Sequence, residues 1–339
     1  MTDQGGSSPQ PMDPGPPTGT PAPGLPPPPG YLVGPAAGDL RYHRLLTRPR
    51  PWWRCLAAVV LGVLGLLVGP VIVLVVAALG AKLLGRSLSF DLDNGLSAGE
   101  MLVLNLGLAL LIPLSALSYR LVYRRSPRWL SSLRPGLRGR WLLRCAGMAL
   151  AVWFLLMVLA TTGAALDRDA PVDSAVVWFI VVVLLTTPLQ AAGEEYLFRG
   201  LVLQGLGSTR LPTWVCCVVS AALFATAHGQ FDPPLFADRF VIGVAFAYLT
   251  IMTGGLEASI AVHTVKNLAG LIPAALLDDV SETLDPQGGI SWLPVTVDVV
   301  LLAILVPWVL AVCRSRLRRG ELTTSYAGNV TSSSGASRI

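Results

Sequence analysis

Ionisable side chains recur inside long hydrophobic stretches of this chain, and that combination restricts the fold more than any other feature. Hydrophobic residues make up 53% of the 339 residues and charged residues only 13%, with a mean hydropathy of +0.62. A soluble domain carries about 25% charged residues, and an apolar run of about 20 residues suits a helix that crosses a bilayer. The sequence therefore predicts an all-α, polytopic membrane bundle.

Hydrophobic segments set the number of helices that we expect in this bundle. Gly, Pro and charged residues separate one apolar run from the next, so each run is interpreted as a transmembrane helix. About eight such helices are predicted, at residues 55–80, 101–119, 141–166, 174–204, 211–231, 236–254, 256–277 and 292–313.

The charges between these segments predict how the protein lies in the membrane. Arginines gather before the first segment, between the second and third, and after the last, whereas aspartates and glutamates occupy the alternate connections. Cytoplasmic loops are enriched in Lys and Arg. This pattern favours a multi-pass protein of the cell membrane with cytoplasmic N- and C-termini. The formal net charge of +5 comes from arginines that flank the hydrophobic segments, where they would lie next to the lipid bilayer. We therefore expect no nucleic-acid partner.

Three polar patterns stand inside the hydrophobic segments: Glu194-Glu195-x-x-x-Arg199, Phe224-x-x-x-His228 and His263-x-x-x-Asn267. Side chains four residues apart share one face of a helix. Glu195 can therefore pair with Arg199, while His263 and Asn267 can point into the same cavity. Gln190 and Glu194 share a neighbouring face. Ionisable groups inside a membrane are costly and mark functional sites.

The chemistry of these groups suits hydrolysis. A buried carboxylate can act as a general base toward water, and an arginine can keep a second carboxylate ionised. A histidine can orient the water, carry a proton or bind a metal, and an amide can donate to an oxyanion. One Glu with two His also fits a zinc site with an open position. No His-Glu-x-x-His pattern occurs, and no pair of intramembrane aspartates stands out. Gly95-Leu96-Ser97-Ala98-Gly99 has the Gly-x-Ser-x-Gly spacing, but it precedes an apolar helical segment and is not expected to be the strand-to-helix elbow of a serine hydrolase.

The three patterns, in this order, resemble the CPBP family, which includes the CAAX prenyl endoproteases of the Rce1 type and the Abi group of bacteriocin-processing and immunity proteins. The resemblance covers about residues 140–313 and implies an intramembrane endopeptidase, a hydrolase with metalloprotease character left open. It implies that Glu194 activates water with help from His228. His263 and Asn267 would stabilise the oxyanion, and Glu195 and Arg199 would be the supporting pair. A divalent metal such as zinc, held by Glu194, His228 and His263, is one possibility; no metal is the other.

With this resemblance the chain divides into four regions. Residues 1–40 form a disordered, Pro- and Gly-rich cytoplasmic tail. Residues 41–140 hold a basic flank, the first two spans and a basic loop, 141–313 the protease-like core, and 314–339 a basic and then Ser-rich tail. The basic segment 120–140 also carries Trp129, Leu130, Leu133 and Trp141. It is either an ordinary cytoplasmic loop or an amphipathic segment on anionic lipid.

The expected substrate is a membrane-associated or lipid-anchored protein or peptide, reached from the cytoplasm or laterally from lipid. The predicted boundaries place His263, Glu194 and His228 at unequal depths, at about 10, 15 and 24 Å from the cytoplasmic edge. Lys266 is interpreted as a partner of an acidic group or a snorkelling side chain, and His43 as lying outside the site. Two alternatives have a different function: a non-catalytic immunity or scaffold protein, and a proton-coupled transporter.

Overall fold

The computed structural model describes residues 40–46, 52–85, 96–167, 172–209, 211–277, 280 and 291–326. These residues belong to one compact unit, which spans residues 33–339. Within them the structure is helical, and pairing of the β type is limited to the isolated bridges Leu40–Tyr326 and Ser132–Gly255. Most of the predicted N-terminal tail and residues 327–339 lie outside the described residues.

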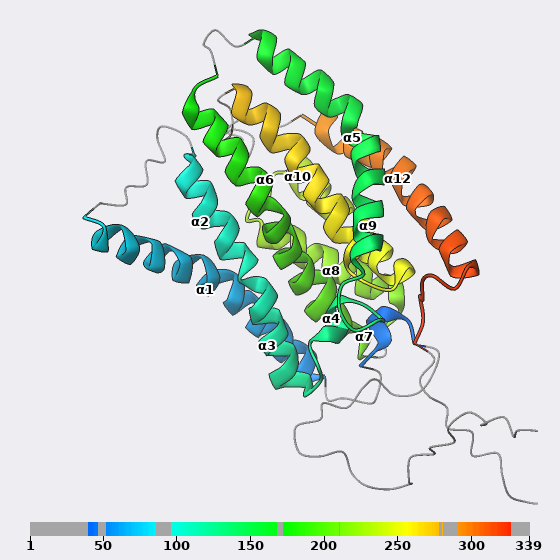
Figure 1. Ribbon diagram of the computed structural model, residues 1–339. Coiled ribbons are helices and arrows are strands. Elements are labelled where there is room, and N and C mark those ends of the chain that lie inside the picture. The colour runs from blue at the N-terminus through cyan, green and yellow to red at the C-terminus, as the bar shows by residue number, and fades with distance from the viewer. Residues whose placement is uncertain are drawn as a thin grey trace, which may run out of the picture. The chain divides into compact units, whose positions relative to one another are not determined.

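The helices follow the predicted hydrophobic segments closely (Figure 1). In chain order they are η1 (Tyr42–Arg44), α1 (Trp53–Leu83), α2 (Ala98–Ala109), α3 (Leu111–Tyr123), α4 (Arg128–Ser131), α5 (Gly139–Asp167), α6 (Ser174–Glu195), η3 (Tyr196–Val202), α7 (Leu203–Gly207), α8 (Thr213–Ala227), α9 (Pro233–Thr253), α10 (Glu257–Leu277) and α12 (Leu293–Arg318).

Seven helical stretches among the described residues are long and apolar enough to cross a bilayer. Two of them combine successive elements, since α2 continues into α3 and α6 continues through η3 into α7. Apolar side chains such as Leu67, Leu155 and Leu185 are more than 60% exposed on these helices, as lipid-facing residues are. The predicted polytopic helical bundle is confirmed, and the chain is a multi-pass membrane protein.

The fifth predicted segment differs from the other seven in length. It was expected to cross the membrane at 211–231, but its helix, α8, has only 15 residues and ends at Ala227. Such a helix is roughly 22 Å long, short of the hydrocarbon thickness of about 30 Å. Gly229 follows with a φ of +70°, a conformation that favours glycine. The chain then enters α9, which packs along α8. The full-length span predicted here was wrong, and α8 ends within the bundle.

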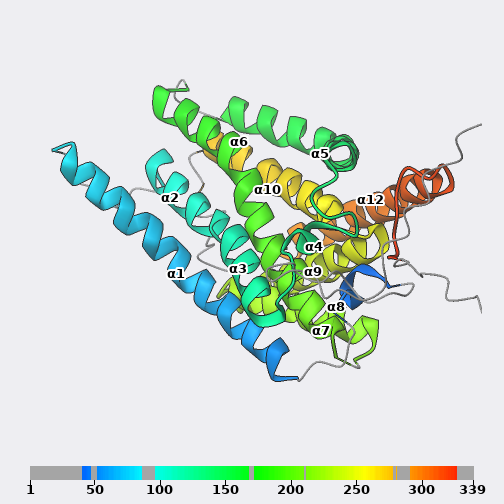
Figure 2. The ribbon, with the colours of Figure 1, turned by 60° about the horizontal axis from the view of Figure 1, so that its bottom comes forward.

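The helices have two ends with different surroundings. At one end, which we call the basic end, η1, α4, α7 and the C-terminal segment meet (Figures 1 and 2). The Leu40–Tyr326 and Ser132–Gly255 bridges lie here, and Arg44 donates 2.9 Å hydrogen bonds to the carbonyls of Gly207 and Thr209. The helix termini at Leu83, Ala98, Leu277 and Leu293 lie at the other end, which we call the opposite end.

One glycine allows a close contact that positions the polar groups. A Cβ at Gly193 of α6 would lie 2.1 Å from the carbonyl oxygen of Leu108 in α2. No real Cβ approaches an oxygen so closely, so only glycine lets α2 and α6 cross here. The same contact brings Asn105 of α2 within 2.8 Å of the hydroxyl of Thr186 in α6. Glu194, the next residue, is held against this crossing.

Candidate active site

Glu194 has one carboxylate oxygen engaged and one open. Its Oε1 accepts a 2.8 Å hydrogen bond from Nε2 of Gln190, one turn earlier on α6. Its Oε2 has no hydrogen-bond partner among the described residues, although it is buried. The nearest cationic or ionisable contact is Nε2 of His263, at 3.5 Å. A buried carboxylate oxygen without a partner is costly, which makes Oε2 a position for a water or a substrate atom.

Glu195 points into a different environment. Its side chain is fully buried, and its Oε1 receives hydrogen bonds from Nη1 of Arg199, at 2.8 Å, and from Nδ1 of His263, at 2.9 Å. Arg199 lies in the π-helical segment η3, and π-helical turns occur frequently at functional sites. The predicted Glu195–Arg199 pair is present, and it reaches His263 on α10 as a third member.

The hydrogen bond to Glu195 fixes the protonation of His263 at one nitrogen. Because a carboxylate only accepts, Nδ1 of His263 carries the proton, and Nε2 faces Glu194. Such a carboxylate–histidine pair sets the tautomer and ring orientation. The rings of Phe246 and Phe224 lie 5.4 and 6.0 Å from the His263 ring, and Cζ of Arg199 lies 4.1 Å from the Phe224 ring centre.

His228 lies immediately after α8 and takes its orientation from the helix end. Its Nδ1 donates to the carbonyl oxygen of Phe224 at 2.9 Å, so in the neutral ring Nε2 is the accepting nitrogen. The Phe224 ring packs edge-on against it at 4.6 Å. Although unequal depths were expected for the motifs, α8 ends at Ala227 and His228 lines the same cavity as Glu194 and His263.

Asn267 belongs to a row of amides leading to Glu194. Its Nδ2 donates to Oε1 of Gln190 at 3.1 Å, and Gln190 in turn donates to Glu194. One hydrogen on Nδ2 is used in this way, which leaves the second for another acceptor. Gln190 was not among the predicted site residues. Its position four residues before Glu194, on the same helix face, is the sequence feature that could have identified it.

A cavity of about 570 Å³ connects these groups. Glu194, His228, His263 and Asn267 line it, whereas Glu195 and Arg199 lie behind the wall. Met101 of α2, Leu235 of α9 and Pro294 of α12 also line it, each within the first turn of its helix. The cavity therefore extends from the middle of the bundle toward the opposite end. The wall also contains α2 and α12, which lie outside the segment that carries the three motifs.

A second charged cluster lines the same cavity. Nζ of Lys266 lies 2.9 Å from Oδ2 of Asp298 and 3.5 Å from Oδ2 of Asp238, and Nη1 of Arg239 lies 3.1 Å from the latter oxygen. Lys266 thus has the acidic partners that one prediction gave it. No pair of aspartates stands out in the sequence because Asp238 and Asp298 come from distant segments, which the packing of α9 against α12 brings together at Lys266.

The predicted zinc ligands do not form a metal site in this geometry. No group of three or more His, Cys, Asp or Glu side chains placed to hold a metal ion occurs in the described part of the chain. Nδ1 of His263 is engaged with Glu195 and Nδ1 of His228 with Phe224, so Nε2 is the nitrogen of each ring that is left for a ligand. Glu194, His228 and His263 therefore do not form such a group with the side chains as they stand.

His43 lies away from the cavity, as expected. It is buried in η1 at the basic end, where Nε2 lies 3.1 Å from the hydroxyl of Thr213. Burial, together with the neighbouring Arg44 and Arg41, lowers the pKa of His43 from 6.5 to about 4. This histidine is therefore a neutral packing residue near pH 7.

The three motifs and their geometry agree with a family comparison. Residues 174–269 match the family described as type II CAAX prenyl endopeptidase, Rce1-like. The match confirms the resemblance and contains every predicted site residue, from Glu194 to Asn267. It is narrower than the range of 140–313 expected from the sequence, and it omits the cavity walls from α2 and α12.

A comparison with curated proteins adds a distant relative. The chain is 26% identical over 213 residues to the uncharacterized protein YyaK of Bacillus subtilis (strain 168), covering 57% of this chain and 68% of the relative. No solved structure matches the chain significantly.

Proposed function

We propose that the protein is an intramembrane endopeptidase that hydrolyses a peptide bond in a membrane-associated or lipid-anchored protein or peptide. One observation carries this proposal: the buried Oε2 of Glu194 has no hydrogen-bond partner among the described residues and belongs to a cavity-lining side chain. The match of residues 174–269 to an endopeptidase family supports it. A cavity of about 570 Å³ has room for a peptide segment.

In this proposal Glu194 is the general base. A water bound at Oε2 gives a proton to the carboxylate while its oxygen attacks the carbonyl carbon of the peptide bond. The tetrahedral intermediate then collapses, the carbon–nitrogen bond breaks, and Glu194 passes the proton to the departing amine. The products are a carboxylic acid and an amine, which ionise to a carboxylate and an ammonium, so atoms and charges balance. Gln190 supports this role, because its bond to Oε1 fixes the rotamer of Glu194.

The oxyanion needs donors at the same cavity wall. Asn267 has one N–H beyond the bond that it makes to Gln190. His263 donates from Nε2 only when both ring nitrogens carry protons, because Nδ1 already donates to Glu195. His228 offers an accepting Nε2 and assists the movement of the proton. Preorganised donors of this kind typically contribute a factor of 10²–10³ to the rate.

Glu195 and Arg199 act as positioning residues. Neither lines the cavity, and both are fully buried. Their ion pair holds His263 in one orientation at 2.9 Å from Glu195. The proposed reaction uses these side chains and a water, and no step of it is routed through a metal ion. We place the protein in the cell membrane, with both termini in the cytoplasm, on the arginine pattern of the connections.

Proton-coupled transport is the second candidate function, and a specific cluster favours it. Asp238, Lys266 and Asp298 line the cavity together with Glu194 and His228, and chains of intramembrane ionisable groups serve as proton relays. Transport predicts movement of a solute into proteoliposomes without a peptide product.

The test compares Glu194→Gln with a matched variant, Glu100→Gln. Glu100 is also a buried glutamate, but it caps the N-terminus of α2 and does not line the cavity. Membrane fractions from cells that express each variant are compared for newly formed N-termini. Those that depend on the wild-type protein should disappear with Glu194→Gln, by a factor of about 10²–10⁴ for loss of a general base, and persist with Glu100→Gln.

Unchanged cleavage by a folded Glu194→Gln variant would contradict the proposal. If His228 and His263 can both be replaced without loss of the cellular phenotype, and no new N-terminus ever appears, a scaffold or immunity role is correct instead.

A further inference from the structure

A second cavity, of about 500 Å³, lies at the basic end of the bundle and plays no part in the proposed reaction. It forms where α5 begins and the segment after α12 passes by. Four arginines and one glutamate contribute to its wall, together with one tryptophan, one glycine and one leucine: Arg134, Arg138, Gly139, Arg140, Trp141, Arg144, Glu321 and Leu322.

The positive charge of this cavity is only partly balanced. Arg138 is committed to Glu257, with Nη2 at 2.6 Å from Oε2. Arg144 lies 3.9 Å from Glu321, which also pairs with Arg316. Arg134 and Arg140 are exposed, and their side chains make no hydrogen bond or ion pair with any other residue that the structure describes. An excess of guanidinium groups therefore faces the cavity, and guanidinium is well suited to bind phosphate.

The structure changes how segment 120–140 can meet lipid. An amphipathic segment would insert its apolar side chains into the bilayer surface. Leu130, Leu133 and Trp141 are instead at most 4% exposed, and they pack inside the protein. The lipid contact considered for these residues was wrong, and the groups that remain available are the arginines.

An apolar surface continues from the arginines along α5. Leu143, Leu150 and Phe154 are 70%, 44% and 63% exposed. Their spacing of seven and four residues puts them on one helical face, and Arg140, three residues before Leu143, lies beside it. Gly147 lies between them, with nothing within 4 Å of where its Cβ would be. A phosphate ion makes no favourable contact with such an apolar surface, whereas the acyl chain of a lipid can lie along it.

We propose that this cavity binds the headgroup phosphate of an anionic phospholipid, with an acyl chain along the exposed face of α5. In this cavity the carboxylate of Glu321 competes with the phosphate for Arg144 and Arg316. The position at the helix ends agrees with the known preference of basic pockets between membrane helices for anionic headgroups. This inference stands independently of the proposed protease activity.

The experiment titrates the detergent-solubilised full-length protein with dihexanoyl phosphatidylglycerol and counts bound lipids by native mass spectrometry. Parallel arms use dihexanoyl phosphatidylcholine and inorganic phosphate. The double variant Arg140→Gln/Arg144→Gln should bind phosphatidylglycerol about 30-fold more weakly, at roughly fivefold per arginine. Glu321→Gln should bind it more tightly, because it removes the competing carboxylate.

Arg120→Gln is the matched control, since Arg120 is an exposed arginine of α3 that does not line the cavity. It should bind phosphatidylglycerol like the wild type. The proposal is overturned if the double variant and the wild type bind phosphatidylglycerol equally, or if phosphatidylcholine binds as tightly as phosphatidylglycerol. Displacement of the lipid by inorganic phosphate at equal concentration would identify a free-phosphate site instead.

Discussion

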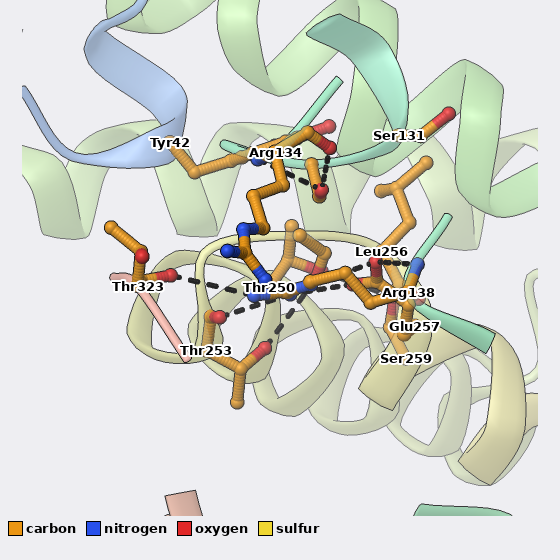
Figure 3. A network of polar contacts seen from close by, with 12 residues as sticks. Tyr42, Ser131, Arg134, Arg138, Thr250, Thr253, Leu256, Glu257, Ser259 and Thr323 are labelled. Carbon is orange, nitrogen blue, oxygen red and sulfur yellow. Dashed lines mark hydrogen bonds and ion pairs between the residues drawn. The ribbon is translucent and has the colours of Figure 1, made fainter. Parts of the chain in front are cut away.

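Charged side chains are buried in two regions of this protein, the basic end and the candidate active site, and the two regions differ in how fully those side chains are hydrogen-bonded. At the basic end, Oε1 of Glu257 accepts from the backbone N–H of Arg138 at 2.8 Å and from its Nε at 2.9 Å, and Arg138 also reaches the carbonyls of Thr253 and Thr323 (Figure 3). In the site, by contrast, Oε2 of Glu194, Oε2 of Glu195, Nε of Arg199 and Oδ1 of Asp238 have no hydrogen-bond partner among the described residues.

The Arg138–Glu257 pair is a structural ion pair, whereas the charged groups of the candidate site keep atoms available for a bound molecule. Arg138 and Glu257 fasten the loop before α5 to the start of α10, so their hydrogen-bonding capacity is used within the fold. Buried polar groups that lack partners are rare and indicate strain, catalysis or a bound molecule. Two of these atoms, Oε2 of Glu194 and Oδ1 of Asp238, belong to side chains that line the cavity of about 570 Å³, where a substrate or water would supply the missing bonds.

The largest expected effect concerns the side of the membrane that the basic end and the opposite end of the bundle each face. With cytoplasmic termini, the opposite end and the cavity that extends toward it face away from the cytoplasm. Of the two expected routes to the site, from the cytoplasm or laterally from lipid, this orientation favours the lateral one. Ser291→Cys at the opposite end should react with a membrane-impermeant thiol reagent in intact cells, and Arg134→Cys at the basic end should not.

Both of those positions are exposed, and the native cysteines among the described residues are buried, so the background of this labelling is low. Labelling of Arg134→Cys alone would reverse the proposed orientation.

A second test removes one partner from each region. Glu257→Gln leaves Arg138, whose side chain is only 10% exposed, without its countercharge, and breaking a buried pair costs about 3–5 kcal/mol. Glu194→Gln removes a carboxylate whose Oε2 lacks a hydrogen bond, so we expect a loss of less than about 1 kcal/mol. Thermal unfolding in detergent measures both. Equal destabilisation by the two variants would remove the distinction between the regions.

Gly193→Ala tests the helix crossing that supports Glu194. The added methyl group would meet the Leu108 carbonyl at 2.1 Å, and overpacking of this kind costs about 1–3 kcal/mol. Cleavage should fall as α6 moves away from α2. Gly163→Ala in α5 is the control, because its Cβ would have nothing within 4 Å; a similar loss there would assign the effect to helix propensity rather than contact.

The smallest expected effect is a pH dependence at the basic end. The folded pKa of His43, about 4, lies below its ordinary value of about 6.5. Between these values the unfolded chain binds more protons, so stability is complete above pH 6.5 and falls as the pH drops toward 4. Between pH 7 and 5.5 the loss is about 1 kcal/mol. His43→Gln should reduce this slope in unfolding measured at both pH values; an unchanged slope would assign it to other groups.

Much of the site was predictable because helix periodicity is a local property. The hydrophobic segments gave the helices to within a few residues, and the four-residue spacings gave the Glu195–Arg199 pair directly. The partner of Lys266 was predictable only as an acidic group. Asp238 and Asp298 were missed because each is a single acid within an apolar segment, and they are 60 positions apart in the chain.

By itself, the sequence determined that the chain crosses a membrane and which helices carry its polar groups, because hydrophobicity and the helical repeat act over short distances. Only the tertiary structure decided that Glu194 faces the cavity while Glu195 lies behind it, that α8 stops at Ala227, and that α2 and α12 close the cavity wall. Adjacent residues on a helix point about 100° apart, so which of two neighbouring glutamates meets the cavity depends on the helices packed around them.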